Sequence, residues 1–192
     1  MVIAVHGASG YTGRLVLDAL RRTRTETVLL GRDTGRLREA AGDAGVPGAE
    51  LRRARLDTPD ELAAALRGCA AVINCAGPFV RLGEPVVRAA LDTGTPYLDI
   101  GGEQGYVLRV FDAYGSTAKR AGVPVVPMVN DGGFLADLLA HLTAAAGRAA
   151  DRRPGRGGGR APRDRGRHHV AWQRAQCTGQ PGGVHRRWPH PP

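Results

Sequence analysis

The sequence predicts an α/β protein built on a doubly wound parallel sheet of about six strands, followed by a disordered basic tail. Short apolar runs alternate with amphipathic segments over residues 1–147. The alternation stops near residue 150, where arginine, glycine and proline dominate. Strands that alternate with helices form right-handed crossovers. Because the alternation ends near residue 150, we expect one domain over 1–147 and a tail over 148–192.

The strands are predicted from apolar runs that are mostly uninterrupted, as in parallel strands covered by helices on both faces. We expect them at 2–7, 27–32, 50–57, 70–77, 97–102 and 123–129. The run at 50–57 is more polar than the others, which places it near an edge of the sheet.

Amphipathic segments predict a helix after each strand. These segments cover 11–22, 33–42, 58–68, 83–94, 106–122 and 134–147. In the first of them, one helical face carries Leu15, Val16, Ala19 and Leu20. Local signals also mark helix ends, because polar caps satisfy free N–H groups. Asp33 is a predicted N-cap, and Thr58, Pro59 and Glu61 have the spacing of a capping box with proline at the first helical position.

Three glycines lie where the first strand meets the first helix, in the spacing G-x-x-G-x-x-G. The first permits a tight turn, the second leaves room for a bound group, and the third allows the helix to pack closely. The N–H groups at the helix start then suit a diphosphate. The predicted contacts are Gly7, Ser9, Gly10, Tyr11, Thr12 and Gly13. In this strand–turn–helix context we interpret the fold as Rossmann-like and dinucleotide-binding; the alternative is a tight turn without a ligand.

The residues after the second strand decide between two dinucleotides. An arginine there pairs with a 2′-phosphate, whereas an acidic residue binds a free ribose hydroxyl. The sequence places Arg32 first and Asp33 next, and Asp33 already has a role as a helix cap. We therefore favour NADP over NAD, with a solvated arginine of no function as the alternative.

Further cofactor contacts are expected at the ends of the third and fourth strands, because strand carboxyl ends line the cofactor crevice. Asp57 either reaches the adenine amino group or is a turn residue. Asn74, Ala76 and Gly77 are expected near the nicotinamide ribose, with Pro78 fixing the turn.

Five segments together resemble the NADP-binding domain of the saccharopine dehydrogenase-like reductases, a family that includes trans-acting enoyl reductases. They read GASGYTGRLV, LLGRD, VINCAGPF, GEPVVRAALDTGTPYLDIGGE and PMVNDGGFLADLLAHL. The resemblance covers residues 2 to about 146. It implies hydride transfer with NADP to an enoyl, imine or carbonyl group of a small-molecule substrate. It also implies a second domain for substrate and subunit contacts. We therefore include a second copy of the chain, in a homo-oligomer, among the candidate partners.

The chain departs from this family in two places. Members continue well beyond this region, so we expect a chain truncated before its substrate domain, with a non-enzymatic NADP-binding sensor as the alternative. Where members often have proline, glycine, phenylalanine and aspartate, the sequence reads NDGGFLAD, and Phe134 is the match. The resemblance therefore assigns cofactor residues and leaves the catalytic residues unknown.

Most candidates for proton transfer or nucleophilic attack have a structural alternative. Tyr114 and Lys119 are five residues apart, about 140° away from a shared helix face, so we reject them as a catalytic pair. Cys75 has no base at a known spacing, and we interpret it as a small buried side chain. Asp99 and Glu103 are either proton donors or loop and helix caps.

The charge is concentrated in the tail. The chain has a net charge of +9, and residues 151–192 hold ten arginines and two aspartates. This argues against nucleic-acid binding by the domain; an Arg/Gly arm is the alternative. The same composition also fits a gene end read out of frame.

The three cysteines are odd in number and do not have the spacing of metal ligands, so we expect no metal; they are Cys69, Cys75 and Cys177. Reduced thiols and the absence of a predicted signal peptide or membrane span lead us to expect a cytoplasmic protein.

Overall fold

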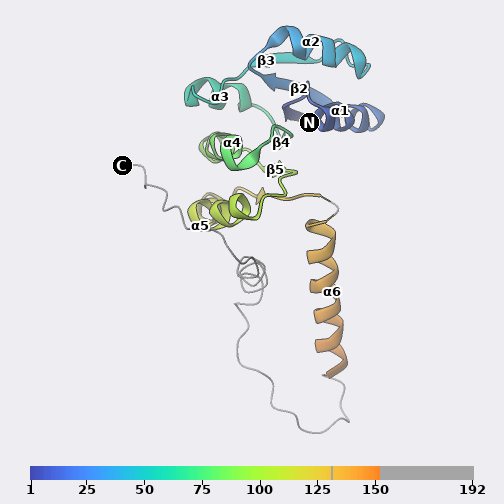
Figure 1. Cartoon of the computed structure of the whole chain (residues 1–192), viewed down its shortest axis with the longest axis vertical. Coiled ribbons are helices and arrows are strands. Elements are labelled where there is room, and N and C mark those ends of the chain that lie inside the picture. The colour runs from blue at the N-terminus through green and yellow to red at the C-terminus, as the bar shows by residue number, and fades with distance from the viewer. Residues whose placement is uncertain (131, 152–192) are drawn as a thin grey trace, which may run out of the picture. The chain divides into compact units, whose positions relative to one another are not determined.

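A computed structural model describes residues 1–130 and 132–151 (Figure 1). The strands are β1 Val2–His6, β2 Glu26–Gly31, β3 Glu50–Arg53, β4 Ala71–Asn74, β5 Tyr97–Asp99 and β6 Val125–Val126. The helices are α1 Tyr11–Arg22, α2 Thr34–Asp43, α3 Pro59–Leu66, α4 Phe79–Thr93, α5 Gln104–Ala121 and α6 Phe134–Asp151. The predicted alternation of strands and helices is confirmed.

The strands form one parallel sheet in the order β3-β2-β1-β4-β5-β6. Val5 of β1 is in register with Leu29 of β2 on one side and with Ile73 of β4 on the other. The chain therefore reverses its direction of travel across the sheet at β1 and β4, where a doubly wound fold places its ligand crevice. The polar strand β3 lies at the edge, as its composition predicted.

Helices cover the two faces of the sheet unequally. On one face, α3, α4 and α5 pack over the sheet around Leu62, Val86 and Val107. On the other, α1 and α2 pack around Leu17 and Leu37. Successive residues of β1 point to opposite faces, so that Ala4 joins the first cluster and Val5 the second.

Several predicted boundaries are wrong for identifiable reasons. The third strand ends at Arg53 rather than 57. The fourth helix begins at Phe79 rather than 83, because the Glu103 carboxylate accepts a hydrogen bond of 2.9 Å from the Phe79 N–H. Asp33 caps α2 as predicted, accepting from the Arg36 N–H. Thr58 makes no capping bond, since its hydroxyl donates to the neighbouring Asp57 carboxylate instead.

The predicted domain boundary at 147 falls inside α6, which continues to Asp151. Residues 148–151 belong to this helix, and the rest of the predicted tail, with Cys177, lies outside the described residues, so that the tail stays a prediction. Met1–Ala146 forms one compact unit. Within the described ranges, none of the helices is both long and apolar enough to cross a bilayer.

Candidate functional site

The β1–α1 loop has the geometry predicted from its first and third glycines. Gly7 has φ +78°, and a Cβ there would lie 2.8 Å from the backbone nitrogen of Ala76. A Cβ at Gly13 would lie 2.3 Å from the Gly7 carbonyl oxygen and 2.7 Å from Cα of Ala8. Both positions require glycine. The loop turns sharply at Gly7, and it packs directly against the residues that follow β4 and against α1.

Gly10 differs from the other two glycines, because the space beside it is more open. It is the N-cap of α1, and no side chain caps the helix. A Cβ at Gly10 would meet only the Gly7 carbonyl oxygen, at 3.3 Å. The first N–H groups of α1 have no helical partner, so they present hydrogen bonds and a partial positive charge at this opening. A diphosphate fits this arrangement.

The other predicted residues of the loop surround the same helix start. Ser9 and Thr12 are half-buried, and Tyr11 is exposed. The backbone carbonyl of Ser9 accepts from Arg14 Nε at 3.5 Å, and Arg14 also forms an ion pair with Asp43 of α2. These bonds hold the loop against α1 and α2 while its outer side stays accessible.

Arg32 follows β2 directly and is exposed. Within residues 1–130 and 132–151 it has no hydrogen-bond or ion-pair partner. The neighbouring Asp33 carboxylate is occupied by the Arg36 N–H, at 3.1 Å. This edge of the site therefore offers an unpaired guanidinium, which suits a phosphate better than a ribose hydroxyl.

Asp57 does not end a strand. It lies in the turn before α3, exposed, and both its oxygens accept hydrogen bonds from Arg55, at 3.0 and 2.7 Å. This ion pair lowers the pKa of the Asp57 carboxyl. The structure gives Asp57 the turn position that was its alternative interpretation; its contact with adenine stays a prediction.

Asn74 ends β4 but faces the interior, with no exposed surface. Its Oδ1 accepts from the Ala76 N–H at 3.1 Å and from Nδ1 of His6 at 2.9 Å. Its Nδ2 donates to the Tyr97 hydroxyl at 3.1 Å. The side chain is thus committed to protein partners, and the position of Asn74 near a ribose stays a prediction.

The predicted residues Ala76, Gly77 and Pro78 lie between the end of β4 and the start of α4. Ala76 is half-buried, whereas Gly77 and Pro78 are exposed. The Gly77–Pro78 peptide bond is cis, and Pro78 is the N-cap of α4. A Cβ added to Gly7 would clash with Ala76, so Ala76 packs directly against the Gly7 turn. The residues that follow β4 therefore lie beside this turn.

A buried polar network lies below this edge, and the sequence interpretation missed it. Both Tyr97 and Tyr106 donate to Oδ2 of Asp99, at 2.9 and 2.7 Å. Oδ1 of Asp99 accepts from the Gly101 and Met128 N–H groups, at 2.8 and 2.9 Å. Burial, followed by the nearby Asp99 charge, raises the pKa of Tyr97 far above its usual value. Tyrosine and aspartate two residues apart on one strand were the only sequence signal for this network.

The remaining catalytic candidates also have structural partners. Glu103 accepts from the Phe79 N–H and, at 3.2 Å, from the Gly102 N–H, which makes it a cap rather than a free acid. Burial raises the pKa of the Cys75 thiol to about 11, in keeping with the interpretation as a packing residue. The Tyr114 hydroxyl donates to Glu84 and accepts from Arg88, not from Lys119.

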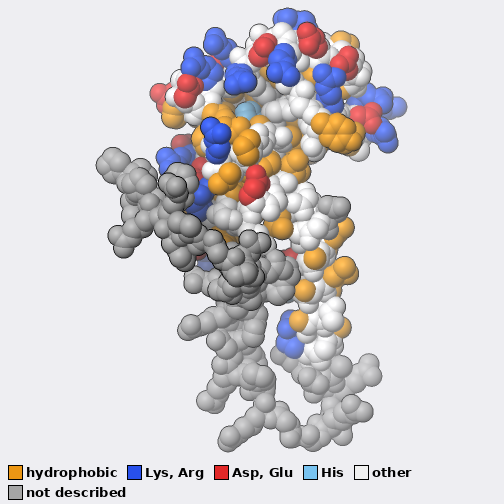
Figure 2. All heavy atoms as spheres, viewed as in Figure 1, with side chains coloured by type: hydrophobic (Ala, Val, Ile, Leu, Met, Phe, Trp, Pro, Cys, Tyr) orange, Lys and Arg blue, Asp and Glu red, His pale blue; other side chains and the backbone are white. Residues whose placement is uncertain are grey.

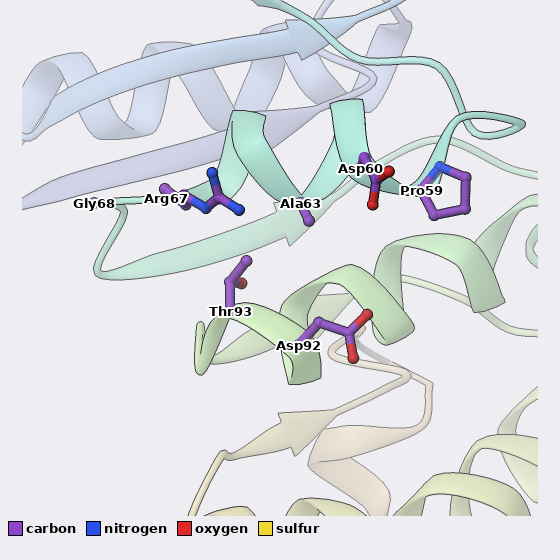
Figure 3. Close-up of a pocket in the computed structure, with 7 residues that line it drawn as sticks. All are labelled: Pro59, Asp60, Ala63, Arg67, Gly68, Asp92 and Thr93. Carbon is purple, nitrogen blue, oxygen red and sulfur yellow. The ribbon is translucent and has the colours of Figure 1, made fainter.

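A surface hollow of the domain lies elsewhere. A cavity of about 460 Å³ opens between α3 and α4, lined by Pro59, Asp60, Ala63, Arg67, Gly68, Asp92 and Thr93 (Figure 3). It belongs to the helical layer and contains none of the predicted cofactor residues. In the described part of the chain, no three acidic, histidine or cysteine side chains group as a metal site would require.

The chain is similar to known proteins over the region that forms the sheet. The family model of the saccharopine dehydrogenase NADP binding domain matches residues 3–139. A lipid droplet localized protein of Caenorhabditis elegans is 32% identical over 146 residues, which is 71% of this chain and 34% of that protein. A trans-acting enoyl reductase of Mycobacterium leprae is 31% identical over 129 residues, which is 65% of this chain and 31% of that protein.

Among solved structures, the saccharopine dehydrogenase (L-Glu forming) of Saccharomyces cerevisiae has the same fold. The TM-score is 0.63 at 17% identity, over 78% of this chain and 32% of that chain. The chain therefore spans about a third of the length of these relatives.

Proposed function

Because this chain belongs to the saccharopine dehydrogenase NADP-binding domain family, we propose that it supplies the coenzyme site of an oxidoreductase. That oxidoreductase would transfer a hydride between NADP and an enoyl, imine or carbonyl group of a small molecule. The trans-acting enoyl reductase among its relatives supports the enoyl group as the first candidate.

One observation carries the proposal: the uncapped start of α1 opens beside an unpaired arginine at the end of β2. In the proposed complex the N–H groups at the head of α1 bind the diphosphate. Arg32 binds the 2′-phosphate, and Gly77 lies toward the nicotinamide end, where strand carboxyl ends line the crevice. When bound, NADP supplies the hydride, while this chain binds and orients the coenzyme.

The chain's own residues at this edge hold the site rather than exchange protons with a substrate. Asp99, Tyr97 and Tyr106 satisfy one another in the interior, and Asp99 and Tyr97 have no exposed surface. This arrangement favours coenzyme binding without turnover by these residues alone. A second candidate function follows from it, that of a sensor that binds NADP and reports it to a partner.

Binding and turnover are measured separately to test the proposal. NADPH and NADH are titrated by fluorescence against the full chain, and NADPH oxidation is followed with enoyl, imine and carbonyl substrates. We expect Arg32→Gln to weaken NADPH binding about tenfold or more and to leave NADH binding unchanged, because a charge-assisted phosphate contact is lost. Arg24→Gln, at the amino end of β2, removes the same charge far from the site and serves as the control. No preference for NADPH in the unmodified chain would contradict the assignment of Arg32. Tight binding without turnover would favour the sensor.

A further inference from the structure

The segment 76–79 leads from β4 into α4, and side chains hold its backbone at both ends. At the first residue, the Ala76 N–H donates to Oδ1 of Asn74, at 3.1 Å. At the last residue, the Phe79 N–H donates to Oε1 of Glu103, at 2.9 Å. The two residues between these points are exposed. The segment is therefore accessible to a ligand although its backbone is fixed.

Glu103 acts at the start of α4 as a helix cap does, although it belongs to another helix. It is the N-cap of α5, yet its side chain does not cap α5. Its Oε1 accepts instead from the first residue of α4, where the N-cap is Pro78, whose ring offers no hydrogen-bonding group. A carboxylate is favourable there because the free N–H groups of a helix start carry partial positive charge. Glu103 therefore fixes where α4 begins.

The ring of Phe79 holds the same residue from the interior. Phe79 is buried, and its ring centroid lies 5.7 Å from that of Tyr106 on α5. A Cβ on Gly101 would lie 3.2 Å from Cγ of Phe79, so the ring also packs against the loop after β5. Removal of the Glu103 carboxylate would therefore free the backbone N–H of Phe79 while its ring stays packed.

The segment and Arg32 lie on the two sides of β1. Arg32 follows β2, the segment 76–79 follows β4, and both of these strands pair with β1. Figure 2 shows charged side chains over α2 and hydrophobic ones gathered around α4. We therefore expect charge to bind the 2′-phosphate end of NADP, and the position of the backbone at 76–79 to decide binding of the other end.

We propose that Glu103 is a positioning residue for the nicotinamide half of the coenzyme. This role rests on the proposed function, in which residues 76–79 form the nicotinamide end of an NADP site. Glu103 acts through the Phe79 N–H and holds the segment in one conformation before the coenzyme arrives. Binding then does not have to order this part of the chain, which increases affinity for the nicotinamide half alone.

Two ligands of the full chain separate this role from a general structural one. NADPH contains both halves of the coenzyme, whereas adenosine 2′,5′-bisphosphate contains only the half proposed to bind at Arg32. By calorimetric titration, we expect Glu103→Ala to weaken NADPH binding about tenfold and to leave binding of the bisphosphate unchanged. Glu103→Gln keeps an oxygen that can accept from the Phe79 N–H, so it is expected to retain most of the NADPH affinity.

Glu84→Ala is the matched control, because Glu84 also joins α4 to α5. Its carboxylate accepts from Arg109 Nε at 2.9 Å and from the Tyr114 hydroxyl at 3.0 Å. This variant is expected to change neither affinity. Hydrogen exchange over the first turn of α4 measures the hold itself, and we expect faster exchange in Glu103→Ala but not in Glu84→Ala.

The outcomes distinguish this role from the coenzyme site on which it rests. If the unmodified chain binds both ligands and Glu103→Ala weakens both equally, or leaves NADPH binding unchanged, Glu103 is not a positioning residue. If the unmodified chain binds neither ligand, the coenzyme site itself is wrong, and this role with it.

Discussion

The hydroxyl of Tyr106 donates a hydrogen bond of 2.7 Å to the carboxylate of Asp99, which has no exposed surface. This one carboxylate collects four donors from three parts of the chain: β5 and the loop after it, α5, and the segment after β6. Because the segment at Met128 connects the sheet to α6, Asp99 ties the end of the sheet to the helix that follows.

We expect Asp99→Ala to lower the free energy of unfolding by about 3 kcal/mol or more, because each buried donor left without an acceptor costs about 1–3 kcal/mol. Urea denaturation followed by circular dichroism measures this loss. Asp112→Ala, an exposed site on α5, is the control and is expected to change stability by less than about 0.5 kcal/mol. Similar effects of the two substitutions would show that the network contributes little.

The sheet could be predicted from the sequence because its signals are local. Most of the strands are apolar runs, and each crossover obeys the same handedness. The start of α4 could not be predicted, since it depends on a hydrogen bond from Phe79 to Glu103, 24 residues away. The helix also continues through Pro85, which lies inside α4. Tertiary hydrogen bonds of this kind leave no periodic trace in a sequence.

The same difference between local signals and tertiary contacts applies to the candidate site. The conformations of Gly7 and Gly13 could be predicted, because the glycines that a strand–turn–helix unit requires lie close together in the sequence. The burial of Asn74 could not, because its partners His6 and Tyr97 come from other strands. The prediction for Asn74 used only the rule that strand carboxyl ends line the cofactor crevice, and this rule does not say which way a side chain points.

Helix α4 contains Gly83, where the ring of Tyr106 leaves no room for a side chain. A Cβ at Gly83 would lie 2.5 Å from Cε2 of Tyr106, whereas one at Gly115 of α5 would meet nothing within 4 Å. We expect Gly83→Ala to destabilise the protein by about 1–3 kcal/mol through overpacking. Gly115→Ala should stabilise it by about 0.5–1 kcal/mol, because alanine is the better helix former. Thermal unfolding of both variants measures the signs, and stabilisation by Gly83→Ala would contradict the packing described.

The two glycines at the head of α1 are expected to separate coenzyme binding from folding. Gly10→Val adds bulk where only the Gly7 carbonyl is near, so we expect a folded protein with NADPH affinity reduced at least about tenfold. Gly13→Ala forces a Cβ to within 2.3 Å of that carbonyl and should lower stability itself. Calorimetric titration and thermal melts on both variants measure the two effects. Unchanged NADPH affinity in Gly10→Val would exclude the proposed diphosphate site.

The stability of the domain is expected to fall in mild acid because of His6. This ring is buried at the end of β1, and burial lowers the pKa of His6 below its usual value, outweighing the opposite effect of the hydrogen bond that Nδ1 donates to Asn74. The unfolded chain, with an ordinary pKa near 6.5, then binds the proton more readily than the folded chain. The contribution of His6 is therefore constant above about pH 6.5 and is lost as the pH falls below it, by up to about 1.4 kcal/mol per pH unit. Urea unfolding between pH 5 and 8 measures this slope. His6→Gln should reduce the slope, whereas His141→Gln, on the exposed surface of α6, should not. An equal slope in the His6 variant and the unmodified chain would assign the acid sensitivity to other groups.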